Sequence, residues 1–348
     1  MSFLSLTAGD VASLSAALAR CRKRCDLARV VRQAVFLGPG MPRAAVARVL
    51  RETYGRQAPP TTYVAQTPVG GAVALELWAF PGTAPLSRSG NACRAHCGGY
   101  AWDFIGGLEM KARQAAYPGV KQLLARARTA YASIGADFGG TVRTWYYMGG
   151  ILRPAAGGDR YAQLNRARNG FYATRWADSG LAPASTAIGM RGGRVSLEAF
   201  ALEKAPGIPG AVWLDNPLQT PPHRYPLRAG RDRNPCFSRG AAVSLDDGTS
   251  LIFVSGTASL RGHEVLHLED PAAQVRVSIE NIAALGVRLA DILQFRVYIK
   301  KAEHAAAVRR RCEALLPDVP RLYLLADVCR EEFSVEIECV AARKRANP

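Results

Sequence analysis

The chain has 348 residues, of which 49% are hydrophobic and 21% charged, a balance that indicates a folded globular protein and excludes a disordered one. Its formal net charge is +17, yet the 38 Arg and 7 Lys are scattered through every segment and form no basic stripe. Such a surface does not predict nucleic-acid binding, whereas its positive field would attract a small acidic substrate.

The expected location of the protein follows from simple sequence patterns. No apolar run approaches the roughly 20 residues that a membrane-spanning helix needs, and the first residues lack the basic start and apolar block of a secretory signal. Eight Cys in 348 residues are too few for a disulfide framework. We therefore expect a cytoplasmic protein that does not bind a membrane.

The first predicted elements are a basic helix over Val11–Ala34 and a strand over Gly71–Phe80. Residues 1–117 otherwise show only weak patterns. The next segment, 120–148, has a helical pattern of apolar residues, then Gly135, then a strand-like run. No fold class can be assigned from this first third of the chain alone.

An internal repeat gives the clearest structural signal. The segment 272–299 has the same helix, glycine and strand pattern as 120–148, and a gap-free alignment places Gly135 on Gly286. Asp270 and Pro271 are suited to the N-cap and first position of the second helix. The repeat therefore predicts two similar units.

Each half is expected to continue in the same way. Helices are predicted near 161–172 and 302–316, and closing strands at 195–198 and 334–338. Helices alternating with strands in this manner predict an α+β fold of two halves, each a mixed sheet covered on one face by helices. A Pro/Gly-rich stretch, residues 206–235, is predicted to connect an N-terminal domain, 1–205, to a C-terminal domain, 236–348.

Two clusters resemble metal sites but lack the required context. His263–His267 matches the H-E-x-x-H pattern, in which both His must lie on one face of a helix. Here Gly262 precedes the motif and the helix starts only after Asp270, so a strand or loop is predicted. A second cluster consists of Cys93, His96 and Cys97, with Cys21 and Cys25 as possible further ligands. We expect idle or buried thiols there and no metal.

The C-terminal half resembles the RidA/YjgF family. The resemblance covers roughly residues 237–342 and is carried by these residues: Phe253–Ser259, His267, Asp270, Gln274 and the terminal run Val335-Glu336-Ile337-Glu338. A RidA-like domain behind a divergent RidA-like half is the layout of the chorismatases, and the chain resembles that family over most of its length. Supporting motifs are Arg143–Tyr147, Leu164–Arg168, Phe171–Tyr172, Asn216–Thr220, Tyr225–Pro226 and Pro235–Arg239.

The resemblance implies a cofactor-free enzyme that releases pyruvate from chorismate, with Glu336 as the general acid. Glu336 alternates with Val335 and Ile337 on the last strand, and Glu338 shares its face. A carboxylic acid that is to donate a proton near neutral pH needs a raised pKa, which an apolar pocket provides. The alternative is an ordinary salt-bridged strand glutamate.

The family divides by product, and two positions imply the branch. Gly240 and Cys329 correspond to the aromatising branch, which forms 3-hydroxybenzoate; the hydrolysing branch has Ala at these positions and forms a dihydroxycyclohexadienoate. Cys329, seven residues before Glu336, is expected to act beside it as a pocket wall and not as a nucleophile. Release of 4-hydroxybenzoate as well stays open.

The dianionic substrate requires guanidinium groups. Arg228, with Tyr225 and Tyr147 as hydroxyl donors, is the first choice for this role, and Arg168 and Arg239 are further candidates. Two other functions remain open at this point. One is a RidA-like imine deaminase, for which Arg321 would be the carboxylate ligand, and the other is a ligand-binding or nucleic-acid-binding module. The oligomeric state, monomer or trimer, is also open.

Overall fold

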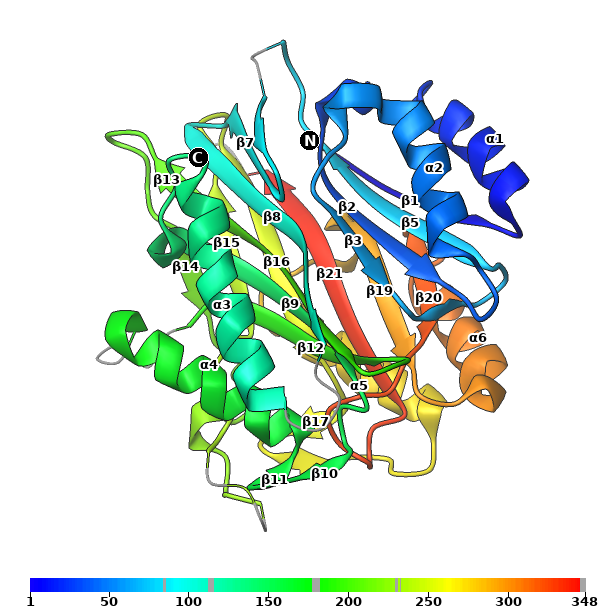
Figure 1. Cartoon of the computed structure of the whole chain (residues 1–348). Coiled ribbons are helices and arrows are strands. Elements are labelled where there is room, and N and C mark those ends of the chain that lie inside the picture. Colours follow the sequence, from blue (N-terminus) through cyan, green and yellow to red (C-terminus); the bar gives the residue numbers. More distant parts are fainter. Residues whose placement is uncertain (84–85, 112–115, 177–181, 229–230, 232, 345–348) are drawn as a thin grey trace.

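The computed structural model describes residues 1–83, 86–111, 116–176, 182–228, 231 and 233–344. Three sheets face one another in the middle of the molecule, and their helices lie on the outside (Figure 1). Each sheet with its helices forms one of three units that follow one another along the chain.

The first unit is a four-stranded sheet in the spatial order β1-β5-β2-β3. Its elements are β1 Ser2–Ala8, α1 Val11–Cys21, β2 Val30–Leu37, α2 Arg43–Tyr54, β3 Thr61–Val64 and β5 Val73–Ala79. The predicted strand over Gly71–Phe80 is confirmed as β5. The predicted helix over Val11–Ala34 is wrong, because the helix ends at Cys21. Asp26 then caps a short 3-10 turn, and the β-branched residues that open β2 are buried between other strands.

The second unit is a six-stranded sheet in the order β12-β9-β13-β8-β7-β6. Its elements are β6 Ser87–Ser89, β7 Ala92–Cys97, β8 Tyr100–Lys111, α3 Ala116–Ala132, β9 Thr141–Gly149, α4 Arg160–Trp176, β12 Ala184–Met190 and β13 Arg194–Lys204. Strands β9 and β12 are parallel and the other pairs are antiparallel. A small ribbon, β10 Pro154–Ala155 with β11 Gly158–Asp159, precedes α4.

The third unit is a seven-stranded sheet in the order β14-β15-β16-β21-β19-β20-β4. Its elements are β14 Val212–Leu214, β15 Gly240–Ser244, β16 Thr249–Thr257, α5 Pro271–Ala283, β19 Ile292–Ile299, α6 Ala305–Leu315, β20 Arg321–Leu325 and β21 Val335–Lys344, joined at the edge by β4 Thr67–Pro68 from the first unit's segment. A second ribbon pairs β17 Leu260–Arg261 with β18 Glu264–Val265.

The three units share one topology. The orders β1-β5-β2-β3, β8-β13-β9-β12 and β16-β21-β19-β20 are the same arrangement with the helices at the same places in the chain. The predicted repeat and fold class are confirmed. Gly135 and Gly286 both adopt positive φ, 71° and 80°, after the first helix of their units, where a side chain would be strained.

The sequence did not predict the first unit as a third copy. Its strands are shorter, and it lacks the hairpin strand that corresponds to β7 and β15. The predicted domain 1–205 thus contains two sheets, and β14, which lies within the predicted connection 206–235, is already part of the third unit's sheet.

Four apolar cores hold the molecule together. Three are local, each between one sheet and its own helices. The fourth lies between the three sheets and contains an aromatic contact from each unit, since Trp78, Phe200 and Phe253 pack with ring centroids 4.8 to 5.9 Å apart. Aromatic pairs at such distances add to the burial of apolar area. The units are therefore fused into one body.

A polar cluster interrupts this central core. Glu76, Glu198 and Glu338 lie on the closing strands of the three units, and all three carboxylates are buried beside Arg32, Arg143 and Arg296. Three positive and three negative charges balance one another. Buried charges of this kind persist only when they are paired and hydrogen-bonded.

The metal-like motif at His263–His267 has the predicted local structure. Glu264 and Val265 form β18, and the flanking residues are turn or loop, so the two His do not share a helical face. Among the helices that the structure describes, none is both long and apolar enough to cross a membrane.

Candidate active site

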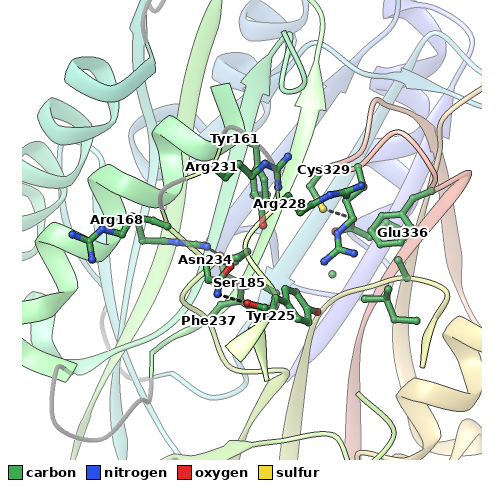
Figure 2. Close-up of a pocket in the computed structure, with 18 of the residues that line it drawn as sticks. Tyr161, Arg168, Ser185, Tyr225, Arg228, Arg231, Asn234, Phe237, Cys329 and Glu336 are labelled. Atoms are coloured by element: carbon green, nitrogen blue, oxygen red, sulfur yellow. Dashed lines mark hydrogen bonds between the residues drawn. The ribbon is translucent and has the colours of Figure 1, made fainter. Parts of the chain in front are cut away.

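The candidate site is a pocket between the second and third units (Figure 2). It encloses about 720 Å³, part of it open to solvent. The second unit contributes α4 and β12, and the third contributes β16, β21 and the loop before β21; the connection between the units covers one side. The lining residues used below are Tyr161, Arg168, Ser185, Tyr225, Arg228, Arg231, Phe237, Arg239, Gly256, Cys329, Arg330 and Glu336.

Glu336 projects into the pocket from β21, where it pairs in register with Tyr298 of β19. Its side chain is buried, and only 3% of the residue is exposed. Burial, followed by the charge of Glu338, raises the pKa of the Glu336 carboxyl to about 8. The group is therefore mostly neutral at pH 7 and can donate a proton.

The neighbouring carboxyl has the opposite character. Glu338 accepts hydrogen bonds or ion pairs from Arg143 at 2.7 Å and Arg296 at 2.6 Å. Although burial acts to raise it, these cations hold the pKa of Glu338 below its usual value. Two carboxyl groups on one strand thus differ in protonation because their partners differ, a pattern typical of acid–base sites.

Only the third unit has a carboxyl at this position. In the matching register Ser196 stands opposite Tyr147 in the second unit, and Ala74 stands opposite Phe36 in the first. The threefold repetition of the fold therefore yields a single candidate acid.

Gly256 of β16 makes room for the acid. A Cβ atom at this position would lie 1.9 Å from Oε1 of Glu336. Its φ is not in the left-handed region, so the requirement for glycine is one of space. Sequence reasoning included Gly256 in the RidA-like stretch but did not identify its contact with Glu336, because the two residues are 80 positions apart in the chain.

Cys329 lies beside the acid, as predicted. Its Sγ is 3.8 Å from Oε2 of Glu336 (Figure 2). Burial and the adjacent Glu336 raise the pKa of the thiol to about 12. The sulfur is therefore a neutral, polarisable wall and not a thiolate nucleophile.

Two buried guanidinium groups line the pocket. Arg168 donates to Asn165 at 2.7 Å and to Ser185 at 3.2 Å, and Arg239 donates to the Thr220 carbonyl at 2.8 Å and to the Tyr225 hydroxyl. Both flank the ring of Phe237, at 5.6 and 5.5 Å from its centroid. Within the described part of the chain, the Nε–H group of each has no hydrogen-bond partner. Such buried donors are suited to an anionic ligand.

The remaining predicted ligands lie nearer the mouth. Arg228 lines the pocket but is exposed and paired with Glu332. Tyr225 is buried, and the guanidinium of Arg330 stacks over its ring at 4.9 Å. Arg231, which sequence reasoning did not select, also lines the pocket and pairs with Asp159.

Two predicted site residues do not line the pocket. Tyr147 is fully buried in the central cluster, where its hydroxyl donates to Glu198 at 2.7 Å and accepts from Arg296 at 3.2 Å. Side chains alternate along β9, so Tyr147 faces the central core while the adjacent Tyr146 faces the second unit's own core. Gly240 begins β15, and a Cβ there would meet the Phe253 carbonyl at 3.1 Å and Leu214, not the pocket. Direct roles for these two residues in binding or product choice do not fit their positions.

The pocket also contains residues that the sequence did not single out, among them Tyr161, Ser185 and Arg330. Tyr161 and Ser185 come from the second unit, and only the packing of β12 against β16 brings them to Glu336. Arg330 directly follows the predicted site residue Cys329, and this adjacency was the one local signal that could have placed it in the pocket. Arg321, the residue implied by an imine deaminase, donates instead to the carbonyls of Val319 and Pro317 and does not line this pocket.

The residues are unsuited to a metal ion. The described part of the chain contains no group of three or more His, Cys, Asp and Glu side chains placed to hold one. Cys93, His96 and Cys97 lie along β7, with Cys93 buried and His96 exposed, as alternation on a strand requires. All eight cysteines lie in the described part of the chain, and none is disulfide-bonded.

Sequence comparisons relate the chain to chorismatases. The profile of the family "Chorismatase FkbO/Hyg5-like, N-terminal" matches residues 76–201. A protein named 3-hydroxybenzoate synthase, from Streptomyces hygroscopicus, is 36% identical over 57% of this chain and 62% of its own length. A chorismatase from Streptomyces rapamycinicus is 37% identical over 58% of this chain and 63% of its own length. The matched region thus spans about three fifths of these relatives.

The structural comparison covers almost the whole chain. A crystal structure of a chorismatase superposes with a TM-score of 0.72 and 21% identity, covering 97% of this chain and 97% of the other. At this identity the match establishes the fold. The predicted resemblance is confirmed: residues 76–201 match the FkbO/Hyg5-like chorismatase model, the chain is similar in sequence to chorismatases, and it has the fold of a chorismatase.

Proposed function

We propose that this protein cleaves the enolpyruvyl ether of chorismate and releases pyruvate and 3-hydroxybenzoate. The observation that carries the proposal is a buried Glu336, whose pKa burial raises to about 8, in a pocket lined by guanidinium groups. A proton donor and several cations are what an acid-catalysed reaction of a dianion requires. The names of the relatives, 3-hydroxybenzoate synthase and chorismatase, support the same substrate.

In the first step Glu336 donates its proton to the methylene carbon of the enolpyruvyl group. The C=C electron pair forms the new C–H bond, which leaves an oxocarbenium ion on the side chain and a carboxylate on Glu336. Arg143 and Arg239, both of which favour the anionic form of Glu336, stabilise that new charge. Because these cations are already in place, little reorganisation accompanies the proton transfer.

In the second step the C4 hydroxyl oxygen attacks C3 of the ring. The bond between C3 and the ether oxygen breaks, its electron pair forms the carbonyl of pyruvate, and the hydroxyl proton returns to the Glu336 carboxylate. The resulting arene oxide rearranges to 3-hydroxybenzoate. We infer that the wall formed by Cys329, which lies beside Glu336, keeps water from the cation and so favours attack by the ring hydroxyl over hydrolysis.

Arg168 and Arg239 are the best-placed carboxylate ligands. Both are buried, hydrogen-bonded in fixed orientations and separated by the ring of Phe237, so they can engage two anionic groups of one rigid substrate. Arg228, the first choice from the sequence, is exposed and already paired with Glu332, which suits a role at the entrance.

Product analysis tests the proposal. Purified protein is incubated with chorismate without added metal or nucleotide, and the products are separated and quantified. Pyruvate and 3-hydroxybenzoate in equal amounts are expected, and 4-hydroxybenzoate would be detected in the same run. A non-aromatic diene would refute the aromatising outcome and support hydrolysis, and the absence of any turnover would refute the activity.

The acid is tested by Glu336→Gln. The amide keeps the shape of the side chain but has no proton to donate, so turnover should fall by about a thousandfold or more while chorismate binding persists. Glu52→Gln on α2 is the matched control, because Glu52 is exposed and only approaches Arg48 at 4.0 Å. A Glu336→Gln protein with undiminished turnover would contradict the assigned role.

We also infer that one chain can supply a complete site. Both walls of the pocket come from units of the same chain, which supports the monomeric alternative, and sedimentation of the purified protein would test it. The unpaired cysteines support the predicted cytoplasmic location. We keep the expectation that the protein does not bind nucleic acid.

A further inference from the structure

The central cluster of buried charges reaches the active site through one member, Glu338. We propose that Glu338 is a positioning residue that acts through Glu336: its carboxylate, held ionised by Arg143 and Arg296, keeps the adjacent Glu336 carboxyl neutral and able to donate its proton. The inference rests on the proposed role of Glu336 and assigns to the cluster a part in catalysis beyond holding the three units together.

The surroundings of Glu338 fix it as an anion. Two cations, Arg143 and Arg296, pair with its two oxygens, and it accepts further hydrogen bonds from the Trp145 indole at 3.1 Å, the Tyr298 hydroxyl at 3.3 Å and the Thr186 hydroxyl. Every one of these groups is a donor. A carboxyl that accepts so many hydrogen bonds has no tendency to take up a proton.

Glu336 lies two residues earlier on the same face of β21, so the two side chains start about 6.6 Å apart. Both are buried between sheets, where charges are poorly screened. When one of two neighbouring carboxyls is held as an anion, ionisation of the other is disfavoured. The proton therefore resides on Glu336, the member that faces the pocket.

The other groups around Glu336 do not replace this effect. The guanidinium groups of Arg168, Arg228, Arg231, Arg233 and Arg330 line the same pocket. The titratable or charged residues that interact with Glu336 directly are Tyr161 of α4, Arg143 of β9, Arg239 before β15, Tyr298 of β19, Cys329 before β21 and Glu338 of β21. The two Arg favour the anionic form of Glu336, and the uncharged Tyr and Cys do not oppose them. Among these described groups, Glu338 is the anion whose charge opposes the cations at Glu336.

The ion pairs of the central cluster connect Glu338 to buried charges of the other two units. Arg296 also pairs with Glu76 of the first unit, and Arg32 pairs with Glu198 of the second. Charge balance in the cluster means that loss of Glu338 would leave Arg143 and Arg296 with excess positive charge beside Glu336. That excess would favour ionisation of Glu336 still further.

The test compares pH profiles of kcat/KM for chorismate. In the unchanged protein, activity should fall above a pH near 8, where Glu336 loses its proton. In Glu338→Gln this alkaline limb should move down by at least about one pH unit, with activity at acid pH retained within about tenfold. Glu338→Asp, which keeps the charge, should restore the limb toward its original position.

A second readout needs no substrate. The C=O stretch of the protonated Glu336 carboxyl is assigned by its loss in Glu336→Gln and is titrated by infrared difference spectroscopy. The pKa obtained in this way should shift together with the alkaline limb of the kcat/KM profile. Glu198→Gln is the matched control: it removes an equally buried carboxylate from the cluster, but one that contacts Arg32 and Tyr147 instead. Glu198→Gln should lower the stability of the protein while the alkaline limb of its pH profile stays near pH 8.

The pair variant Arg143→Met with Glu338→Gln serves if Glu338→Gln does not fold. It removes an anion and a cation together and keeps the cluster neutral. The limb should still move down, because Glu338 affects the Glu336 carboxyl more than Arg143 does. An unchanged titration of Glu336 in whichever variant folds would overturn the inference.

The two proposals fail in different ways. Undiminished chorismate turnover in Glu336→Gln would refute the function proposed for Glu336, whereas the infrared titration would still report whether Glu338 controls its protonation. A lower infrared pKa of Glu336 in Glu338→Gln supports the inference even when no chorismate is turned over.

Discussion

The contact between Gly256 and Glu336 leads to a sharp mutational prediction. Replacing Gly256 by Ala adds a methyl group 1.9 Å from Oε1 of Glu336, 3.0 Å from its Cδ and 3.3 Å from Cγ2 of Thr186. To reach even a tight 3.0 Å separation the oxygen must move by 3.0 − 1.9 = 1.1 Å. The acid would therefore be displaced from the position in which it faces the pocket.

The size of the effect follows from this displacement. A misplacement of about 1 Å can lower turnover by roughly a hundredfold, or about 2.7 kcal/mol in the activation free energy. Overpacking at a buried position should also lower the free energy of unfolding by about 1–3 kcal/mol. The protein should thus remain folded while kcat for chorismate falls by about a hundredfold.

The assay measures chorismate turnover and thermal unfolding of Gly256→Ala beside Gly170→Ala. Gly170 is an exposed glycine within α4, and a Cβ there would meet nothing within 4 Å. Gly170→Ala should leave turnover unchanged and stabilise the helix by up to about 1 kcal/mol. If Gly256→Ala retains full turnover, then the acid does not act from the position that the structure gives it, and the reasoning fails.

Three further predictions concern other groups in the pocket. Folding raises the pKa of Glu336 from 4.5 to about 8, so the stability that this group contributes is present below about pH 4.5 and is lost as the pH rises through 8. Glu336→Gln should therefore raise the unfolding free energy relative to the unchanged protein, and more so at pH 9 than at pH 5. Urea titrations at the two pH values would measure this difference. Arg168→Met should lower kcat/KM for chorismate by about 30-fold or more through loss of a charge-assisted hydrogen bond, and an unaltered KM would exclude it as a carboxylate ligand. Cys329→Ala should divert the product toward the non-aromatic diene, whereas Gly240→Ala should not, because Gly240 lies away from the pocket. Chromatography of the products measures both outcomes. A product shift caused by Gly240→Ala alone would contradict the placement of that residue.

Local patterns were sufficient to predict the repeat, whereas the acid was implied by the family resemblance. The helix, glycine and strand order around Gly135 and Gly286 depends on apolar periodicity and on the conformational freedom of glycine, both of which are local properties. The roles expected for Glu336 and Cys329 came from the resemblance to the chorismatases, whose motifs can be recognised along the sequence. The predicted helix over Val11–Ala34 was too long. The segment from Val30 onward is a strand because it is buried between other strands, and this burial is not visible in the local sequence.

The tertiary structure decided which side chains meet. Tyr147 appeared suited to the substrate, but the packing of three sheets places its hydroxyl in the central cluster. Gly256 meets Glu336 because β16 pairs with β21 in one sheet, and Ser185 reaches the pocket because β12 of the second unit packs against β16. The sequence alone determined where the strands and helices form and which residue could serve as the acid. The protonation of that acid depends on burial and on the charge of Glu338, and both exist only once the three units have packed together.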